Sequence, residues 1–250
     1  ETVRRILLNR NAMLCNITVD QDNWTRVQPK VSNFLQSLPA SPVEIAKWTP
    51  TYNTSFEGLT IPAQVNYVGK GANLYDLGYE SHGSVNVITN FLRTSWLWEK
   101  IRVQGGAYGG FCSFDRDSGV FTYLSYRDPN LLDSLQNYDD TAQFLRNLDI
   151  SQDEIAKSII GSIGTMDTYR LPDAKGYTSM ARHLLKITEE ERQQTRDEIF
   201  STSVAHFKEF GEVLGRLNEA GTVVVLGSQE SITDANEKMG DDWLKTMKVL

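Results

Sequence analysis

Four glycines crowd into six positions between a long amphipathic segment and an apolar one: Gly105, Gly106, Gly109 and Gly110. A glycine inside a strand costs roughly 0.5–1 kcal/mol, so this density needs a physical reason. A helix C-cap with a flexible turn needs one or two glycines. A phosphate-binding loop would precede a helix and carry a lysine. The pattern therefore favours close backbone approach, in which an extended partner or substrate lies directly against the main chain.

Two polar side chains flank these glycines. Arg102 offers five N–H donors in a fixed plane, and Tyr108 offers one hydroxyl. Such a pair suits a carbonyl oxygen that becomes negative during a reaction. We therefore predict a functional site in this stretch. A nucleotide- or phosphate-binding module that uses the glycines remains an alternative, and a thermal shift with common nucleotides would distinguish the two.

The pattern around this stretch predicts an α+β fold, with a mixed, largely antiparallel sheet packed with several helices. Strands are expected at 12–19, 64–69, 109–114, 120–126 and 222–226, the last as a central and final strand. Helices are expected at 22–38, 85–96, after 128–130 and across 151–220, with capping boxes at Ser151/Glu154 and Thr188/Glu191. Pro29 predicts that the first helix either kinks or begins near it.

The ends and the linker predict that the chain is part of something longer. It begins with Glu rather than Met, in a segment that resembles the end of a helix running into a strand. We expect it to be the C-terminal piece of a larger protein, without a signal or transit peptide of its own. Pro39, Pro42 and Pro50 stand among small residues and mark the best linker candidate.

Composition excludes several classes of function. With 250 residues, 40% hydrophobic, the chain can bury a large core. A formal net charge of −7 argues against a nucleic-acid or anionic-membrane binder, which needs clustered Lys and Arg. No apolar run is long enough for a transmembrane helix. Cys15 and Cys112 are too few for a disulfide framework and suit a reducing compartment; Cys112 reads as a buried thiol rather than a nucleophile.

One segment approaches a zinc signature but lacks a ligand. His206-Phe207-Lys208-Glu209-Phe210 carries phenylalanine where the second histidine of an H-x-x-E-H motif would stand. A zinc site needs at least three protein ligands. We therefore expect no metal site in this chain and place His206 on the surface of a helix.

Three segments resemble a known family. The longest strongly resembles the C-terminal half of pitrilysin-type inverzincin zinc metallopeptidases: Leu97-Trp98-Glu99-Lys100-Ile101-Arg102-Val103-Gln104-Gly105-Gly106-Ala107-Tyr108-Gly109. Two more resemble the presequence-protease branch, which consists of organellar oligopeptidases: Ser125-Tyr126-Arg127-Asp128-Pro129-Asn130 and Leu171-Pro172-Asp173-Ala174-Lys175-Gly176-Tyr177. The resemblance covers essentially the whole chain.

The resemblance implies an enzyme of two homologous halves that close around a chamber. Zinc, its ligands and the glutamate that activates water would belong to the N-terminal half, so this chain alone would bind no zinc and be inactive. By the same resemblance, Arg102 and Tyr108 bind the substrate backbone beside the scissile bond and stabilise the tetrahedral oxyanion. The adjoining substrate-binding positions would be Gly105, Gly106, Ala107 and Gly109.

The resemblance also implies a domain division, substrates and an address. Residues 1–40 would be the tail of the preceding peptidase-like domain and residues 41–250 the C-terminal peptidase-like domain. The partners would be the N-terminal half and unfolded peptide substrates, including cleaved targeting peptides. The location would be the mitochondrial matrix, the chloroplast stroma or both. A non-catalytic structural subunit built on the same domain is the alternative; the retained Arg102 and Tyr108 disfavour it, because a scaffold needs neither.

Overall fold

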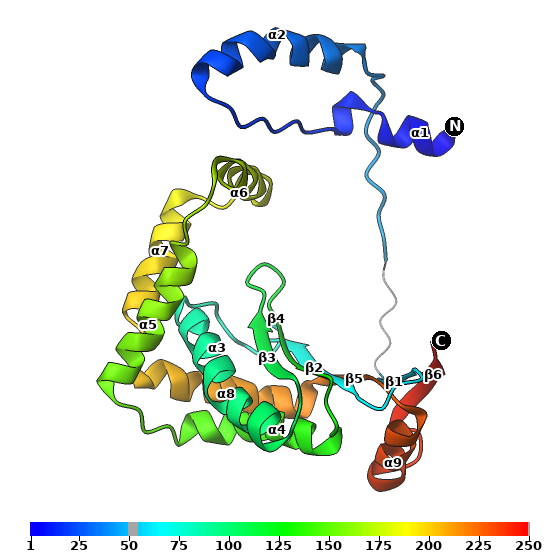
Figure 1. The fold of residues 1–250 in the computed structure, drawn as a ribbon, viewed down its shortest axis with the longest axis vertical. Coiled ribbons are helices and arrows are strands. Elements are labelled where there is room, and N and C mark those ends of the chain that lie inside the picture. The colour runs from blue at the N-terminus through cyan, green and yellow to red at the C-terminus, as the bar shows by residue number, and fades with distance from the viewer. Residues whose placement is uncertain (50–54, 250) are drawn as a thin grey trace. The chain divides into compact units, whose positions relative to one another are not determined.

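The computed structural model describes residues 1–49 and 55–249, which fall into two units. One unit comprises Glu1–Tyr52 with Thr168–Glu191, and the other comprises Asn53–Asp167 with Arg192–Leu250. The larger unit contains the whole sheet and the glycine-rich stretch (Figure 1). The predicted domain division, with residues 168–191 in the C-terminal domain, stays a prediction. Pro50, the last proline of the predicted linker, lies outside the described residues.

The helices and strands follow one another in an α+β order. They are α1 (Thr2–Leu7), the short 3-10 helix η1 (Arg10–Ala12), α2 (Gln21–Ser37), β1 (Phe56–Thr60), β2 (Tyr67–Asn73), α3 (Ser84–Thr94), the π-helix η2 (Trp98–Gln104), β3 (Gly109–Phe114), β4 (Val120–Tyr126), α4 (Leu132–Arg146), α5 (Gln152–Met166), α6 (Pro172–Leu185), α7 (Glu189–Phe200), α8 (Val204–Ala220), β5 (Thr222–Gly227), α9 (Gln229–Met239) and β6 (Leu244–Lys248). The helices α4 to α8 are consecutive between β4 and β5. No described helix is both long and apolar enough to cross a bilayer.

The sheet is mixed and has the strand order β3-β4-β2-β5-β1-β6. β4 pairs antiparallel with β3 and with β2, and β2 also pairs antiparallel with β5. β1 lies parallel to both β5 and β6. Burial alternates along β4: Phe121 and Tyr123 are fully buried, and Leu124 and Tyr126 are 47% and 39% exposed. Since successive strand residues point to opposite faces, one face of the sheet is packed and the other is open within the described residues.

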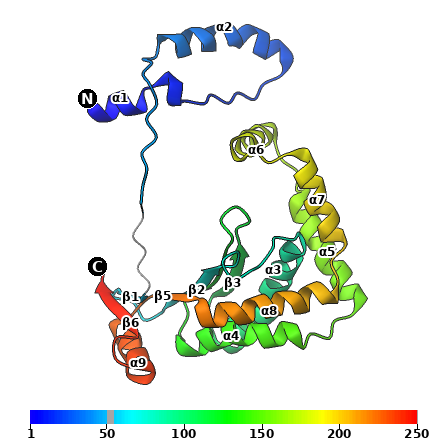
Figure 2. The same cartoon turned by 180° about the vertical axis from the view of Figure 1, so that it is seen from behind.

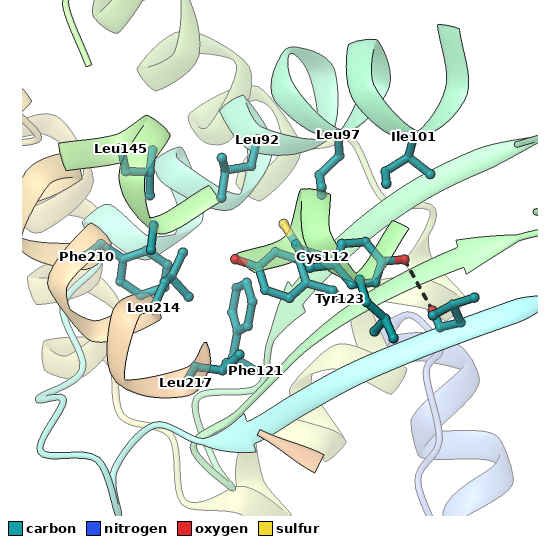
Figure 3. Packing of buried hydrophobic residues seen from close by; sticks show 14 of the residues in the cluster. Leu92, Leu97, Ile101, Cys112, Phe121, Tyr123, Leu145, Phe210, Leu214 and Leu217 are labelled. Carbon is teal, nitrogen blue, oxygen red and sulfur yellow. Dashed lines mark hydrogen bonds between the residues drawn. The ribbon is translucent and has the colours of Figure 1, made fainter. Parts of the chain in front are cut away.

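The packed face forms the core with α3, α4 and α8. Leu92, Leu97 and Ile101 approach it from one side, and Phe210, Leu214 and Leu217 of α8 from another (Figure 3). Tyr123 of β4 stacks on Tyr138 of α4 with ring centroids 4.9 Å apart. α4 and α8 lie side by side, as Figures 1 and 2 both show. This layer fixes the position of β3 and β4, which carry the candidate site.

Much of the predicted order is confirmed, and the α+β class with its mixed sheet is correct. The β3–β4 hairpin occupies the predicted residues, and the two capping boxes form: Glu154 N–H to the Ser151 hydroxyl at 3.3 Å, and Glu191 N–H to the Thr188 hydroxyl at 3.1 Å. The prediction for Pro29 is wrong: helix α2 begins at Gln21, is capped by Asp20 and runs unbroken through Pro29.

Other predictions are wrong for physical reasons. The strand predicted at 12–19 is absent: Ala12 belongs to η1 and residues 13–20 form neither helix nor strand, with the alternating Met13 and Val19 left 44% and 47% exposed instead of packed on a sheet. The predicted helix 85–96 ends at Thr94, where Ser95 leaves helical geometry at φ −121° and ψ −87°. The strand at 222–226 is central but not final, since α9 and β6 follow it. The strand predicted at 64–69 is shifted, to Tyr67–Asn73.

Two histidines from distant parts of the chain stack at the ends of α3 and α8. The rings of His82 and His206 are 4.7 Å apart and tilted by 13°. The Nδ1 of His206 accepts the Ser203 backbone N–H at 3.0 Å, and the Nδ1 of His82 accepts the Ser84 N–H at 3.2 Å. Both bonds need an unprotonated Nδ1. Burial, and then the neighbouring His82, lower the pKa of His206, while Glu209 opposes this shift.

This arrangement predicts that stability falls in mild acid. Because the folded-state pKa of His206 is lowered, its contribution is complete above about pH 6.5 and is lost as the pH falls through the folded pKa. His206→Asn places an amide oxygen where Nδ1 accepts the cap bond but does not titrate. Thermal unfolding from about pH 7.5 to 5.5 should lower Tm less in this variant than in the wild type. Equal losses would show that His206 does not contribute.

Candidate functional site

The chain enters the glycine-rich stretch through η2, which is wider than an α-helix. The Lys100 carbonyl accepts the Gly105 N–H at 3.0 Å, and the Ile101 carbonyl accepts the Ala107 N–H at 3.1 Å. Ile101 is 1% exposed and points toward the core beside Leu97 (Figure 3). Isolated π-turns are frequent at functional sites. With Ile101 anchored inward, the next residue, Arg102, lies on the exposed side of the turn.

The Arg102 guanidinium is held by aromatic rings alone. Its Cζ lies 4.3 Å from the centre of the Trp98 ring and 5.6 Å from that of Tyr108. Both distances are within the range of cation–π attraction. Among the described residues, the guanidinium makes no ion pair and no hydrogen bond. Its charge and N–H donors are therefore available to a ligand.

Tyr108 lies immediately before β3 with its ring outside the core. Its backbone N–H donates to the Tyr126 carbonyl at 3.0 Å, which fixes the residue to the start of the hairpin. Its ring meets Tyr126 edge-on at 5.7 Å, and Tyr126 in turn meets Tyr67 at 5.4 Å. The side chain is 65% exposed, and its hydroxyl has no hydrogen-bond partner within the described part of the chain. Tyr108 and Arg102 are thus adjacent, as the sequence predicts of a shared site.

Internal packing accounts for most of the glycines. A Cβ at Gly105 would lie 2.7 Å from the Ile101 carbonyl, and one at Gly109 would lie 2.5 Å from the Phe111 ring. A Cβ at Gly110 would lie 2.8 Å from that of Ile101. Gly106 has a φ of +76°, which favours glycine. The glycines therefore let β3 pack against η2, and their number is not by itself evidence of a substrate.

The predicted substrate-binding positions differ in accessibility. Ala107 is 4% exposed with its side chain inward, and Gly109 is buried. The Gly105 carbonyl already accepts a hydrogen bond from the Asn130 amide at 2.6 Å. Gly106 is exposed. Of these four positions, Gly106 offers the most accessible backbone. The role of all four in substrate binding stays a prediction.

The site stands at the edge of the sheet. β3 pairs only with β4, so its other edge is unpaired among the described strands. On the open face beside it, Phe111 and its cross-strand partner Leu124 are 46% and 47% exposed. An unpaired edge with exposed apolar side chains is a surface on which an extended peptide can add as a strand.

Sequence reasoning missed Trp98, Tyr126 and Asn130. Trp98 precedes Arg102 by four residues, and that spacing on a helix brings two side chains together, so the signal was present. Tyr126 is aligned with Gly109 across the hairpin, which only the register shows. Asn130 reaches Gly105 from 25 residues away, and no local pattern predicts such a contact.

The other candidate groups do not form a reactive centre. Cys112 is 2% exposed, and burial raises the pKa of its thiol to about 12, as expected of a buried thiol rather than a nucleophile. Within residues 1–49 and 55–249, no three His, Cys, Asp or Glu side chains lie close enough together to hold a metal ion. The described residues therefore do not fit a zinc site.

Comparisons with known proteins agree with this fold. Residues 56–229 match the family described as "PreP C-terminal domain". Over 95% of its length, the chain is 49% identical to presequence protease 1, chloroplastic/mitochondrial, of Arabidopsis thaliana, and covers 22% of that protein. It is 24% identical to the mitochondrial presequence protease of Mus musculus over 92% of its length, covering 25% of that protein.

A solved structure of pitrilysin shares the fold. The TM-score is 0.56 at 12% identity, over 92% of this chain and 25% of pitrilysin. The chain thus spans about a quarter or less of each of these relatives.

The packing of Gly110 gives a test of the η2–β3 contact. Gly110→Ala should lower stability by about 1–3 kcal/mol, because a new methyl group must displace Ile101. Gly164→Ala is the control: a Cβ there meets nothing within 4 Å in α5, and alanine favours a helix by about 1 kcal/mol. Urea unfolding of both variants measures the difference. A Gly110→Ala chain as stable as the wild type would contradict the contact.

Proposed function

Because this chain belongs to the presequence protease C-terminal domain family, we propose that it is the substrate-binding part of a zinc metalloendopeptidase. Arg102 and Tyr108 bind the substrate backbone beside the scissile bond and stabilise the oxyanion. The observation that carries this proposal is a pair of adjacent, exposed side chains. The Arg102 Cζ lies 5.6 Å from the centre of the Tyr108 ring, and no described residue uses the donors of the guanidinium or of the hydroxyl.

The two groups suit the charge that develops during hydrolysis. When a peptide carbonyl becomes tetrahedral, its oxygen gains negative charge and attracts fixed donors more strongly than in the ground state. A guanidinium N–H and a phenol O–H are such donors, and removing one of them typically costs about 10²–10³ in rate. Ring contacts hold Arg102 and a backbone hydrogen bond anchors Tyr108, so little reorganisation is needed at the moment of reaction.

The substrates we propose are unfolded peptides, including cleaved targeting peptides. An unfolded peptide is extended, and the free edge of β3 offers it backbone donors and acceptors beside Arg102 and Tyr108. Targeting peptides are basic and amphipathic, and the net charge of −7 together with the exposed Phe111 and Leu124 is compatible with both properties. The names of the plant and mouse relatives support the mitochondrial matrix or chloroplast stroma as the location.

The metal belongs to the other half of the enzyme in this proposal. Bound zinc polarises the carbonyl and lowers the pKa of water. As the family resemblance implies, the N-terminal half would supply zinc, its ligands and the general base; the described residues of this chain offer no cluster that could hold the metal. The isolated 250-residue chain is then inactive, and its partner is that N-terminal half. A purely structural subunit would not need the exposed Arg102 guanidinium, which no described residue pairs.

Kinetics of the full-length parent enzyme test the roles of both residues. Arg102→Ala and Tyr108→Phe should each lower kcat/KM for a peptide at least about tenfold, mostly in kcat, because the lost contact strengthens in the transition state. Zinc content should not change.

The control is Tyr169→Phe, which removes the hydroxyl of another exposed tyrosine. Tyr169 lies in the loop between α5 and α6 and is 79% exposed, and its replacement should leave turnover unchanged. Turnover near wild type in both site variants would overturn the assignment.

A further inference from the structure

We propose that Trp98 is a positioning residue for Arg102, an inference that rests on the proposed function. Its indole ring holds the guanidinium at the site and leaves the N–H donors free for substrate. Trp98 and Arg102 are four residues apart on η2, and the Arg102 Cζ lies 4.3 Å from the ring centre. This distance is shorter than the 5.6 Å of the Arg127–Tyr126 and Arg196–Phe200 contacts.

Core packing does not explain the large ring at this position. Trp98 is 47% exposed, while its neighbour Leu97 and the following Ile101 are fully buried and hold η2 against the sheet. Its indole N–H has no hydrogen-bond partner among the described residues, whereas that of Trp96 donates to the Asn137 carbonyl at 3.1 Å. Its ring instead lies against the Arg102 guanidinium.

A ring fixes an arginine in a way that a carboxylate does not. A carboxylate would occupy two N–H donors and offset the positive charge, whereas an aromatic face attracts the cation and leaves the donors in the guanidinium plane free. The nearest carboxylate in sequence, Glu99, accepts a hydrogen bond from the Gln104 amide at 2.9 Å instead. No carboxylate among the described residues thus forms an ion pair with Arg102.

Arg196 provides the contrast. Its guanidinium also lies near a ring, 5.6 Å from the centre of Phe200, but it binds Asp167 through two hydrogen bonds of 2.7 Å. Its donors are committed to that structural pair. Arg102 is aligned by rings and has no such partner within the described residues, which is the arrangement expected of a residue kept ready for a ligand.

The test is a double-mutant cycle in the full-length enzyme with the variants Trp98→Leu, Arg102→Ala and their combination. Trp98→Leu should lower kcat/KM about three- to thirtyfold, the range expected from one cation–π contact, and mostly in kcat. In the Arg102→Ala background it should have almost no further effect, because residues that act through one another are not additive.

Two further variants separate positioning from stability. Trp98→Phe keeps a ring and should retain activity within about threefold of wild type. Phe200→Leu is the matched control and should leave kcat/KM unchanged. It removes a 54% exposed ring beside Arg196, whose donors already bind Asp167. If Trp98→Leu unfolds early, Trp98→Met, which has a flexible unbranched side chain without a ring, replaces it.

The outcomes distinguish this inference from the proposed function. A large loss in Arg102→Ala with wild-type turnover in Trp98→Leu overturns the role of Trp98 and keeps that of Arg102. An equal loss from Trp98→Leu in both backgrounds also overturns it, since the ring would then act independently of the guanidinium. Wild-type turnover in Arg102→Ala overturns both proposals.

Discussion

The site depends on how closely β3 packs against η2. Gly110 lies where a Cβ would be 2.8 Å from that of Ile101, and Gly105 where a Cβ would be 2.7 Å from the Ile101 carbonyl. Hydrogen bonds from Gly105 and Ala107 to η2 carbonyls close this wide turn. Two backbones can approach this closely only where side chains are absent. As a result Arg102 and Tyr108, on either side of the turn, are adjacent and exposed, with the Arg102 Cζ 5.6 Å from the centre of the Tyr108 ring.

The features predicted correctly are those with a local cause. Buried residues alternate with more exposed ones along β4, and the two capping boxes use neighbouring residues. The segments missed by sequence reasoning depend on distant neighbours. β1 has Gly58 at its centre, where a Cβ would meet Ile232 of α9 at 2.8 Å, and β6 buries only Leu244. Neither has the apolar run that identifies a strand.

The site shows the same division between local and distant causes. The types and spacing of Arg102 and Tyr108 identified the donors, and their adjacency follows from a turn that the glycines already indicated. Contacts with Ile101 and Phe111 account for three of the glycines from within the chain, and the predicted approach of a substrate to them stays a prediction. Asn130, which binds the Gly105 carbonyl, depends on the return of the chain after β4. Under the proposed function, a metal held by another part of the parent enzyme complements these donors.

The most direct measurement is a crystal structure of the full-length enzyme with a peptide phosphinate, whose tetrahedral oxygen imitates the oxyanion. The account predicts that the Arg102 guanidinium and the Tyr108 hydroxyl both lie within about 2.7–3.1 Å of phosphinate or adjoining backbone oxygens. It also predicts that Trp98 remains stacked on the guanidinium. A bound phosphinate with both groups beyond hydrogen-bonding distance, and with no water between, would contradict the central claim.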